Sequence, residues 1–198
     1  MIRLFFLAFC LSATPLHAAD NGASWLNRLQ QAVRSLGEYE VRFELSTTDG
    51  YATTGSCRVS GESYVISLPQ ARVYCDGKAR YEVNDDKREV VVDAVDTESR
   101  NLLDNPVRAF DFVGEQYDVR IAAEQPERIT LRLTPRSTDA LSVIELTLDK
   151  SSALPVSVIY GAEDMRIALK IVSFGKSATP FPDFRRADFA GYEWIDFR

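Results

Sequence analysis

Histidine is almost absent from this sequence: among 198 residues there is one, His17. Basic residues are also in the minority, with 23 Lys and Arg against 29 Asp and Glu and a formal net charge of −6. A groove for nucleic-acid phosphates needs clustered Lys and Arg, so the charge balance argues against a nucleic-acid partner. The same balance argues against electrostatic attraction to an anionic membrane surface.

Residues 1–19 have the pattern of a cleavable secretory signal peptide. Arg3 precedes an apolar stretch, and the segment ends in the small residues Ala18 and Ala19, which suit a signal peptidase. The stretch is shorter than the ~18 apolar residues of a membrane span, and no later run reaches that length. We therefore expect an exported protein with a single domain over residues 20–198.

Cleavage of this segment removes the histidine, so the mature chain contains no imidazole. Its formal charge becomes −7, and two cysteines remain, Cys57 and Cys75. Such a chain can build neither a Ser-His-Asp nor a Cys-His mechanism, and no zinc or copper site that needs histidine. Its carboxylates do not stand in apolar settings that would tune them for catalysis. We expect no enzyme, no metal and no cofactor; an esterase or glycosidase is the least supported alternative.

The mature chain opens with one long amphipathic helix. Over residues 23–37, apolar side chains recur at helical spacing and leave one polar face, and Gly37 suits the C-terminal end. The period then changes to 2, because Tyr39, Val41, Phe43 and Leu45 alternate with charged residues. This alternation predicts a strand with one apolar and one polar face.

Turn signals divide the rest of the chain into short segments of strand character. Strands are predicted over residues 51–60, 63–68, 72–76, 80–84, 89–94, 117–122, 128–134, 141–148, 155–160, 165–174 and 192–197. One or two short helices are expected within residues 96–112. The fold class is mainly β with an α lid, and the strand spacing indicates a closed or nearly closed antiparallel sheet.

A curled sheet of this width is not filled by its own side chains, since barrels of about eight strands already hold one small ligand. The long helix and the mid-chain segment could fill the interior and make an ordinary core, or they could cover a ligand cavity. The pattern alone leaves both possibilities open.

The order of several motifs resembles the LolA family, the periplasmic carriers of outer-membrane lipoproteins. The leading helix runs into the strand at residues 40–45, and a hairpin follows at residues 55–64. The strongest match is the turn at residues 74–78, Tyr-Cys-Asp-Gly-Lys, with Tyr81 soon after. The remaining matches are residues 104–106, residues 129–136 and the ending at residues 192–198, which resembles the Bacteroidetes branch. No single motif is specific; their order, their spacing and the export signal carry the resemblance.

The resemblance implies a strongly curved, half-open antiparallel β-barrel of about 10–11 strands covered by helices. In the family, the covered apolar cavity takes up the acyl chains of a lipoprotein. An inner-membrane ABC-type lipoprotein-releasing complex loads this cargo, and an outer-membrane acceptor or the membrane itself receives it. We accordingly expect a periplasmic monomer that shuttles acylated lipoproteins from the inner to the outer membrane without covalent change.

Candidate residues for such a cavity follow from the apolar faces. An ordinary core explains them equally well, because alternation shows a buried face but not what it faces. The candidates for the cavity wall are Val41, Phe43, Leu45, Tyr64, Ile66, Leu68, Val90, Val92, Leu131, Leu133, Val158 and Tyr160. The candidates for a lid are Trp25, Leu29, Val33, Leu36, Phe110 and Phe112.

The hairpin at residues 55–64 departs from the family pattern. Proteobacterial members have an Arg-Pro pair there, and the arginine of this pair helps to hold the lid shut. In this chain the corresponding residues are Ser60 and Gly61. Neither Arg58 nor Arg72 can be assigned that role.

Cys57 and Cys75 are predicted to flank one strand from either side. Two strand spacings of about 9.5 Å exceed the ~7 Å limit for a disulfide. We therefore expect unpaired thiols, although an exported protein meets an oxidising compartment.

Two alternative functions share this fold. One is an RseB-like regulatory protein that senses lipids or mislocalised lipoproteins, although the chain lacks the further C-terminal domain of such regulators. The other is a lipid-binding envelope protein without transfer activity.

Overall fold

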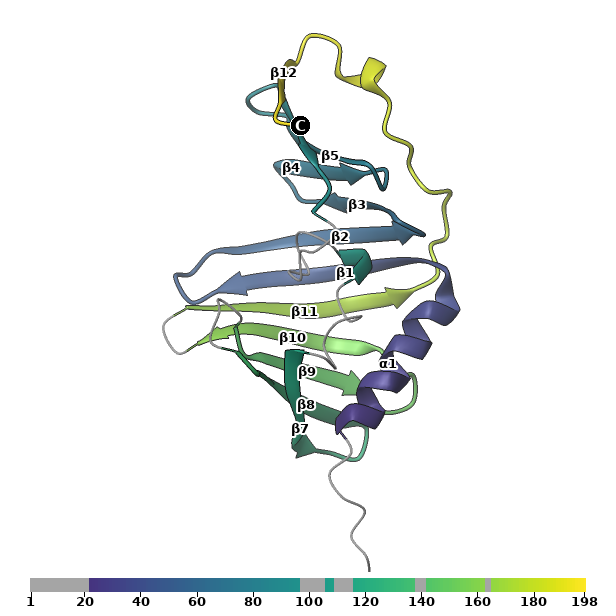
Figure 1. Cartoon of the computed structure of the whole chain (residues 1–198), viewed down its shortest axis with the longest axis vertical. Coiled ribbons are helices and arrows are strands. Elements are labelled where there is room, and N and C mark those ends of the chain that lie inside the picture. Colours follow the sequence, from purple (N-terminus) through teal and green to yellow (C-terminus); the bar gives the residue numbers. More distant parts are fainter. Residues whose placement is uncertain (1–21, 97–105, 109–115, 138–141, 163–164) are drawn as a thin grey trace, which may run out of the picture.

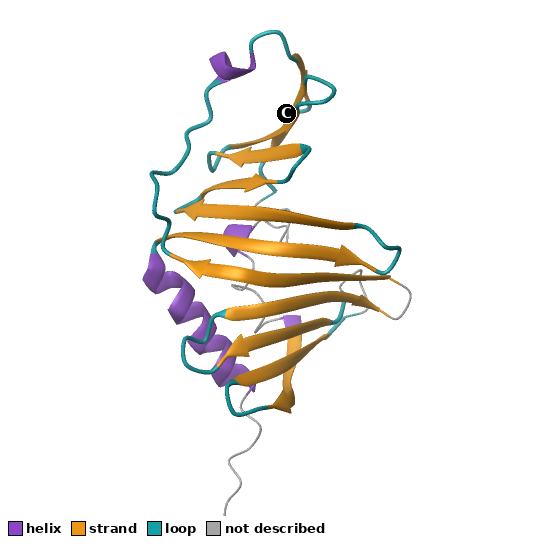
Figure 2. Ribbon diagram, turned by 180° about the vertical axis from the view of Figure 1, so that it is seen from behind, coloured by secondary structure: helices purple, strands orange, loops and turns teal. Residues whose placement is uncertain are grey.

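The computed structural model describes residues 22–96, 106–108, 116–137, 142–162 and 165–198. Within these ranges the chain is mainly β: one curved, open sheet of twelve strands carries one long helix along the ends of its strands (Figures 1 and 2). The predicted signal peptide and the lid candidates Phe110 and Phe112 lie outside the described residues. No helix among the described residues is long and apolar enough to cross a membrane.

Helix α1 (Gly22–Leu36) follows the predicted pattern closely. Its apolar face buries Leu26 and Leu29. The helix ends where Gly37 adopts a φ of +70° and donates its N–H to the carbonyl of Arg34. Helices commonly end with a residue in the left-handed conformation, and glycine adopts this conformation without steric strain because it has no Cβ atom.

The sheet has the order β12-β6-β5-β4-β3-β2-β1-β11-β10-β9-β8-β7, with β12 and β7 at its two edges. Neighbouring strands are antiparallel except β12, which pairs with β6 in parallel. The strands are β1 (Glu38–Thr47), β2 (Ala52–Ser60), β3 (Ser63–Ser67), β4 (Ala71–Cys75), β5 (Ala79–Asn84), β6 (Glu89–Ala94), β7 (Tyr117–Glu124), β8 (Arg128–Pro135), β9 (Ile144–Asp149), β10 (Pro155–Ala162), β11 (Met165–Gly175) and β12 (Glu193–Asp196). Two short 3-10 helices are η1 (Pro106–Arg108) and η2 (Arg186–Phe189).

The buried apolar side chains form two clusters, and the larger one covers the inner face of β1–β4 and β7–β11. It includes Phe43, Tyr64, Leu131 and Leu169, and the apolar face of α1 packs onto it. Directly paired residues of antiparallel strands lie on one face of a sheet. Val41 of β1 pairs with Cys57 of β2, and Cys57 pairs with Ile66 of β3. These three residues therefore lie on the same inner face.

The apolar face changes sides between β4 and β5. Cys75 of the main cluster pairs with Arg80, and Arg80 pairs with Asp93, so the inner face of β5 and β6 carries charged residues. The alternate residues Val90 and Val92 are buried on the opposite face, in the second cluster. These two predicted cavity residues therefore face away from the main cluster.

The C-terminal segment covers this opposite face of β4–β6. It runs along the sheet from β11 to the far edge (Figure 1), where β12 pairs with β6. The ring of Phe184 stacks on Tyr81 with 4.0 Å between centroids, and Phe189 lies 5.4 Å from Phe184. Arg58 holds the start of the segment, because its guanidinium donates to the carbonyl oxygen of Thr179 and pairs with Glu38 at 3.0 Å.

Candidate functional site

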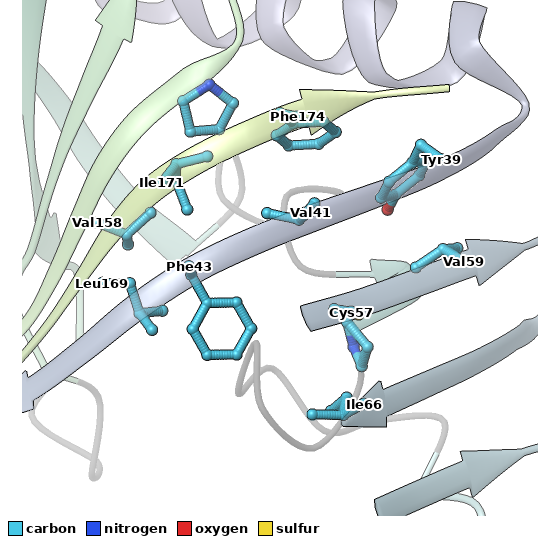
Figure 3. Close-up of a pocket in the computed structure, with 12 residues that line it drawn as sticks. Tyr39, Val41, Phe43, Cys57, Val59, Ile66, Val158, Leu169, Ile171 and Phe174 are labelled. Atoms are coloured by element: carbon cyan, nitrogen blue, oxygen red, sulfur yellow. The ribbon is translucent and has the colours of Figure 1, made fainter. Parts of the chain in front are cut away.

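An apolar pocket lies on the inner face of the sheet, where β1, β2, β3, β10 and β11 meet (Figure 3). The described residues that line it carry no charge, and their only polar side-chain groups are the Tyr39 hydroxyl and the Cys57 thiol. They are Tyr39, Val41, Phe43, Cys57, Val59, Ile66, Pro106, Pro155, Val158, Leu169, Ile171 and Phe174. Such a surface offers a ligand little except apolar contact.

The volume of the pocket is about 70 Å³. An engineered apolar cavity that takes up benzene has about 150 Å³, and sites for larger small molecules have roughly 300–1,000 Å³. In this conformation the pocket therefore accommodates only part of an acyl chain, and uptake of a whole chain requires it to widen.

Strand alternation and one irregularity build the pocket wall. Val41 and Phe43 are two residues apart on β1 and therefore share its inner face. On β11 a β-bulge lies opposite Arg42 and Phe43, and it puts Ile171 and Phe174 on the same inner face although they are three residues apart. Val172, the residue after Ile171, points outward and is 58% exposed.

Burial also determines the chemistry of the Cys57 thiol. Loss of solvent raises the pKa of Cys57 from 9.0 to about 12. A thiol that stays protonated is a poor nucleophile and a poor metal ligand. Among the described residues, no group of three or more His, Cys, Asp or Glu side chains could hold a metal ion.

The structure brings four of the predicted wall residues to the pocket: Val41, Phe43, Ile66 and Val158. The others on the inner face belong to the surrounding core instead. Tyr64, Leu131 and Leu133 are fully buried in the main cluster, and Leu45, Leu68 and Tyr160 pack against it.

The helix residues predicted as a lid pack on the core beside the pocket. Leu29 is fully buried, and Trp25, Val33 and Leu36 are partly buried against the main cluster. The lining residues that the structure describes include none from α1; Pro106 of η1 supplies the mid-chain contact. A lid function for α1 stays a prediction.

Several lining residues were not predicted from the sequence. Tyr39 is in phase with the predicted wall residues Val41 and Phe43 on β1, so strict application of the period of two would have included it. Cys57 lies on β2, a strand from which no wall residue was predicted. Phe174 could not be found in this way, because the bulge in β11 interrupts the alternation. Pro106 and Pro155 lie at the start of their elements, where no periodicity exists.

No protein-family model and no curated protein matches this sequence. The solved structures that share this fold include the following two. An uncharacterised conserved protein from Thermus thermophilus has a TM-score of 0.57 and 12% identity, over 88% of this chain and 98% of that chain. The lipoprotein LppX of Mycobacterium tuberculosis has a TM-score of 0.50 and 9% identity, over 80% and 97%.

Solved structures with lower TM-scores include a LolA superfamily protein, NE2245 from Nitrosomonas europaea. Its TM-score is 0.40 at 10% identity, over 80% of this chain and 94% of that chain. MucB of Pseudomonas aeruginosa, solved in complex with MucA, has a TM-score of 0.44 at 24% identity. That match covers 82% of this chain but 59% of the MucB chain.

Proposed function

We propose that this chain is an envelope carrier that binds the acyl chains of lipoproteins in the apolar pocket and shuttles them from the inner to the outer membrane. The observation that carries the proposal is the pocket itself, an uncharged concavity on the inner face of a curved sheet. The order of sequence motifs that resembles the LolA family supports the same function. This role involves no covalent chemistry, so the carrier is not an enzyme.

The energetics of an acyl chain explain why such a carrier is needed. Each CH₂ group exposed to water costs about 0.8 kcal/mol, so a chain with about fifteen of them costs roughly 12 kcal/mol in water. A carrier must offset most of this cost and still release its cargo. A small pocket that widens for the ligand meets both requirements better than a large rigid one, because part of the binding energy drives the opening.

The proposed route has three partners. An ABC-type lipoprotein-releasing complex of the inner membrane would load the carrier, acylated lipoproteins would be its cargo, and an outer-membrane acceptor or the membrane would receive them. The protein would act as a periplasmic monomer, exported by a signal peptide in residues 1–19.

The native Cys57 thiol provides a direct binding test. In a Cys75→Ser background it is the single cysteine of the mature chain, and it lies in the pocket wall. A triacylated lipopeptide is expected to slow alkylation of Cys57 by N-ethylmaleimide at least about tenfold, since the bound chains cover the thiol. Alkylation at an unchanged rate, over a range of lipopeptide concentrations, would exclude acyl binding at this site.

Neighbouring residues on β11 supply a matched control for that test. Ile171→Gln puts a polar group in the pocket wall and is expected to remove the protection. Val172→Gln changes the adjacent, outward side chain and is expected to preserve it, because Val172 is 58% exposed. Equal effects of the two substitutions would place the ligand elsewhere.

Transfer is tested separately from binding. The purified protein is expected to release newly made lipoproteins from spheroplasts and to carry acylated peptide that mass spectrometry detects. A protein that binds the lipopeptide but releases nothing from spheroplasts would be a lipid-binding or lipid-sensing protein, as in the two alternatives, and not a carrier.

A further inference from the structure

Phe43 on β1 lies directly across from Gly55 on β2. A Cβ atom at Gly55 would lie 2.7 Å from Cζ of Phe43 and 2.8 Å from Cε2 of the same ring. It would also lie 2.8 Å from Cδ2 of Leu68. These separations are well inside the ~3.5–4.0 Å contact distance of carbon atoms. The phenyl ring therefore occupies the space that any other residue at position 55 would fill.

Gly55 is required for this space and not for its backbone conformation. It is not among the glycines of positive φ, which include Gly37 and Gly61. It stands in the middle of β2, where glycine weakens a strand and typically marks a close approach of another group. Here that group is the aromatic ring of its cross-strand partner, an arrangement that stabilises a strand glycine.

The same ring forms one wall of the apolar pocket. In Figure 3 the Phe43 ring lies between Leu169 on one side and Cys57 and Ile66 on the other. Sheet order places these residues on β11, β1, β2 and β3 in succession. The position of the ring therefore sets the width of the pocket along the sheet. Because the recess over Gly55 accepts the ring, the ring is held against β2 and away from the centre of the pocket.

We propose that Phe43 and Gly55 together determine which acyl chains the pocket accepts. The absence of a side chain at Gly55 leaves room for the Phe43 ring beside β2. A side chain at position 55 would displace the ring into the pocket and narrow it. This inference rests on the proposed function, because it concerns the selectivity of the acyl-chain site. It assigns a specificity-determining role to a glycine that does not itself line the pocket.

The test is a double-mutant cycle on the mature protein. The variants are Gly55→Ala, Phe43→Leu and the combination of both, and the readout is displacement of a dansyl-labelled undecanoic acid by saturated fatty acids from decanoic to stearic acid. Gly55→Ala is expected to push the ring into the pocket and to weaken binding of the longer acids about tenfold relative to decanoic acid. The double variant is expected to regain the wild-type profile, because leucine vacates the space that the new methyl group takes.

Phe43→Leu alone keeps the proposal testable if Gly55→Ala fails to fold. It widens the pocket and is expected to raise the relative affinity for a methyl-branched chain, phytanic acid, at least about fivefold over the straight-chain acid. Ser56→Ala is the control, since Ser56 follows Gly55 and pairs with Arg42 on the other face. The control is expected to keep the wild-type profile.

Three results separate the possible failures. If the wild-type protein does not bind the dansyl-labelled acid, the proposed acyl-binding function is wrong. If the wild type binds it and Phe43→Leu leaves the selectivity unchanged, the specificity role of the pair is wrong. If Gly55→Ala lowers the urea midpoint of unfolding but keeps the wild-type profile, the glycine serves packing only, which also overturns the inference.

Discussion

Cys57 and Cys75 lie on opposite sides of β3: Cys57 is paired with Ile66 of that strand, and Cys75 is paired with Tyr64. Two strand spacings of about 9.5 Å separate their strands, which is beyond the ~7 Å reach of a disulfide. Both cysteines are free and buried. The prediction of unpaired thiols, made from the expected register, is confirmed.

These thiols should remain reduced and react only slowly in the native protein, also in an oxidising medium. We expect both thiols to react with Ellman's reagent at least about a hundredfold more slowly under native conditions than in guanidinium chloride, where two equivalents react in a chain of residues 20–198. Burial is the reason, because it protects both sulfur atoms from the reagent. A native mass that rises on reduction, followed by alkylation of two new thiols, would contradict the expectation.

Stability should decrease at alkaline pH because of Cys57. The pKa of this thiol is raised from 9.0 to about 12 by burial, so between these values the unfolded chain loses a proton that the folded chain keeps. The free energy of unfolding therefore falls as pH rises above about 9, by up to about 1.4 kcal/mol per pH unit for one proton. The loss stops near the folded pKa.

Urea unfolding from neutral pH to about pH 11 measures this dependence. Cys57→Ala is expected to have a smaller slope than the wild type. Some slope should remain, because burial also raises the pKa of Tyr64 and of Tyr160. Identical slopes for the variant and the wild type would show that Cys57 does not contribute.

Arg58 should stabilise the attachment of the C-terminal segment. Its side chain is 14% exposed, pairs with Glu38 and donates to Thr179. Arg58→Met keeps most of the apolar stem but loses these charged hydrogen bonds, so we expect a loss of about 1–3 kcal/mol in unfolding free energy. Hydrogen exchange should become faster in residues 176–184.

Arg42 is the matched control on the neighbouring strand. It also pairs with a glutamate, Glu40, but its side chain is 66% exposed. An exposed ion pair contributes little, so Arg42→Met should change stability by less than about 0.5 kcal/mol. If the two variants behave alike, Arg58 does not anchor the segment.

The second apolar cluster should be independent of the pocket. Phe184 stacks on Tyr81 and contacts Tyr74 at 5.3 Å between centroids, on the face opposite the pocket. Phe184→Ala is expected to cost about 2–4 kcal/mol of stability and to leave acyl binding unchanged. Phe197→Ala, at a ring that is 71% exposed, should leave both properties unchanged. A Phe184→Ala variant that folds but no longer binds acyl chains would show coupling between the two faces.

Local patterns predicted α1 and the positions of the strands, but not η2 or the parallel pairing of β12 with β6. The apolar period of 23–37 predicts α1, and the alternation from Tyr39 to Leu45 predicts β1 with its inner face. Turn signals place most strand ends within a residue or two, as for β6 at Glu89–Ala94. These features depend on neighbours along the chain, which a sequence shows directly.

Which face of the sheet a residue occupies could not be predicted for every strand. Val90 and Val92 have the same apolar, β-branched character as Val41, yet they lie on the opposite face. Alternation identifies a buried face but does not say which side of the sheet it is. The answer depends on the C-terminal segment, whose Phe184 and Phe189 cover that side.

The sequence by itself determined that the one histidine lies in residues 1–19, that one amphipathic helix comes first, and that a succession of short strands follows. The tertiary structure alone decided that the apolar surface changes sides between β4 and β5, that a bulge in β11 brings Ile171 and Phe174 to one pocket, and that Gly55 accommodates the ring of Phe43. The physical reason is that these features arise from pairing between strands distant in the chain. Their register and the space between their side chains exist only once the sheet has formed.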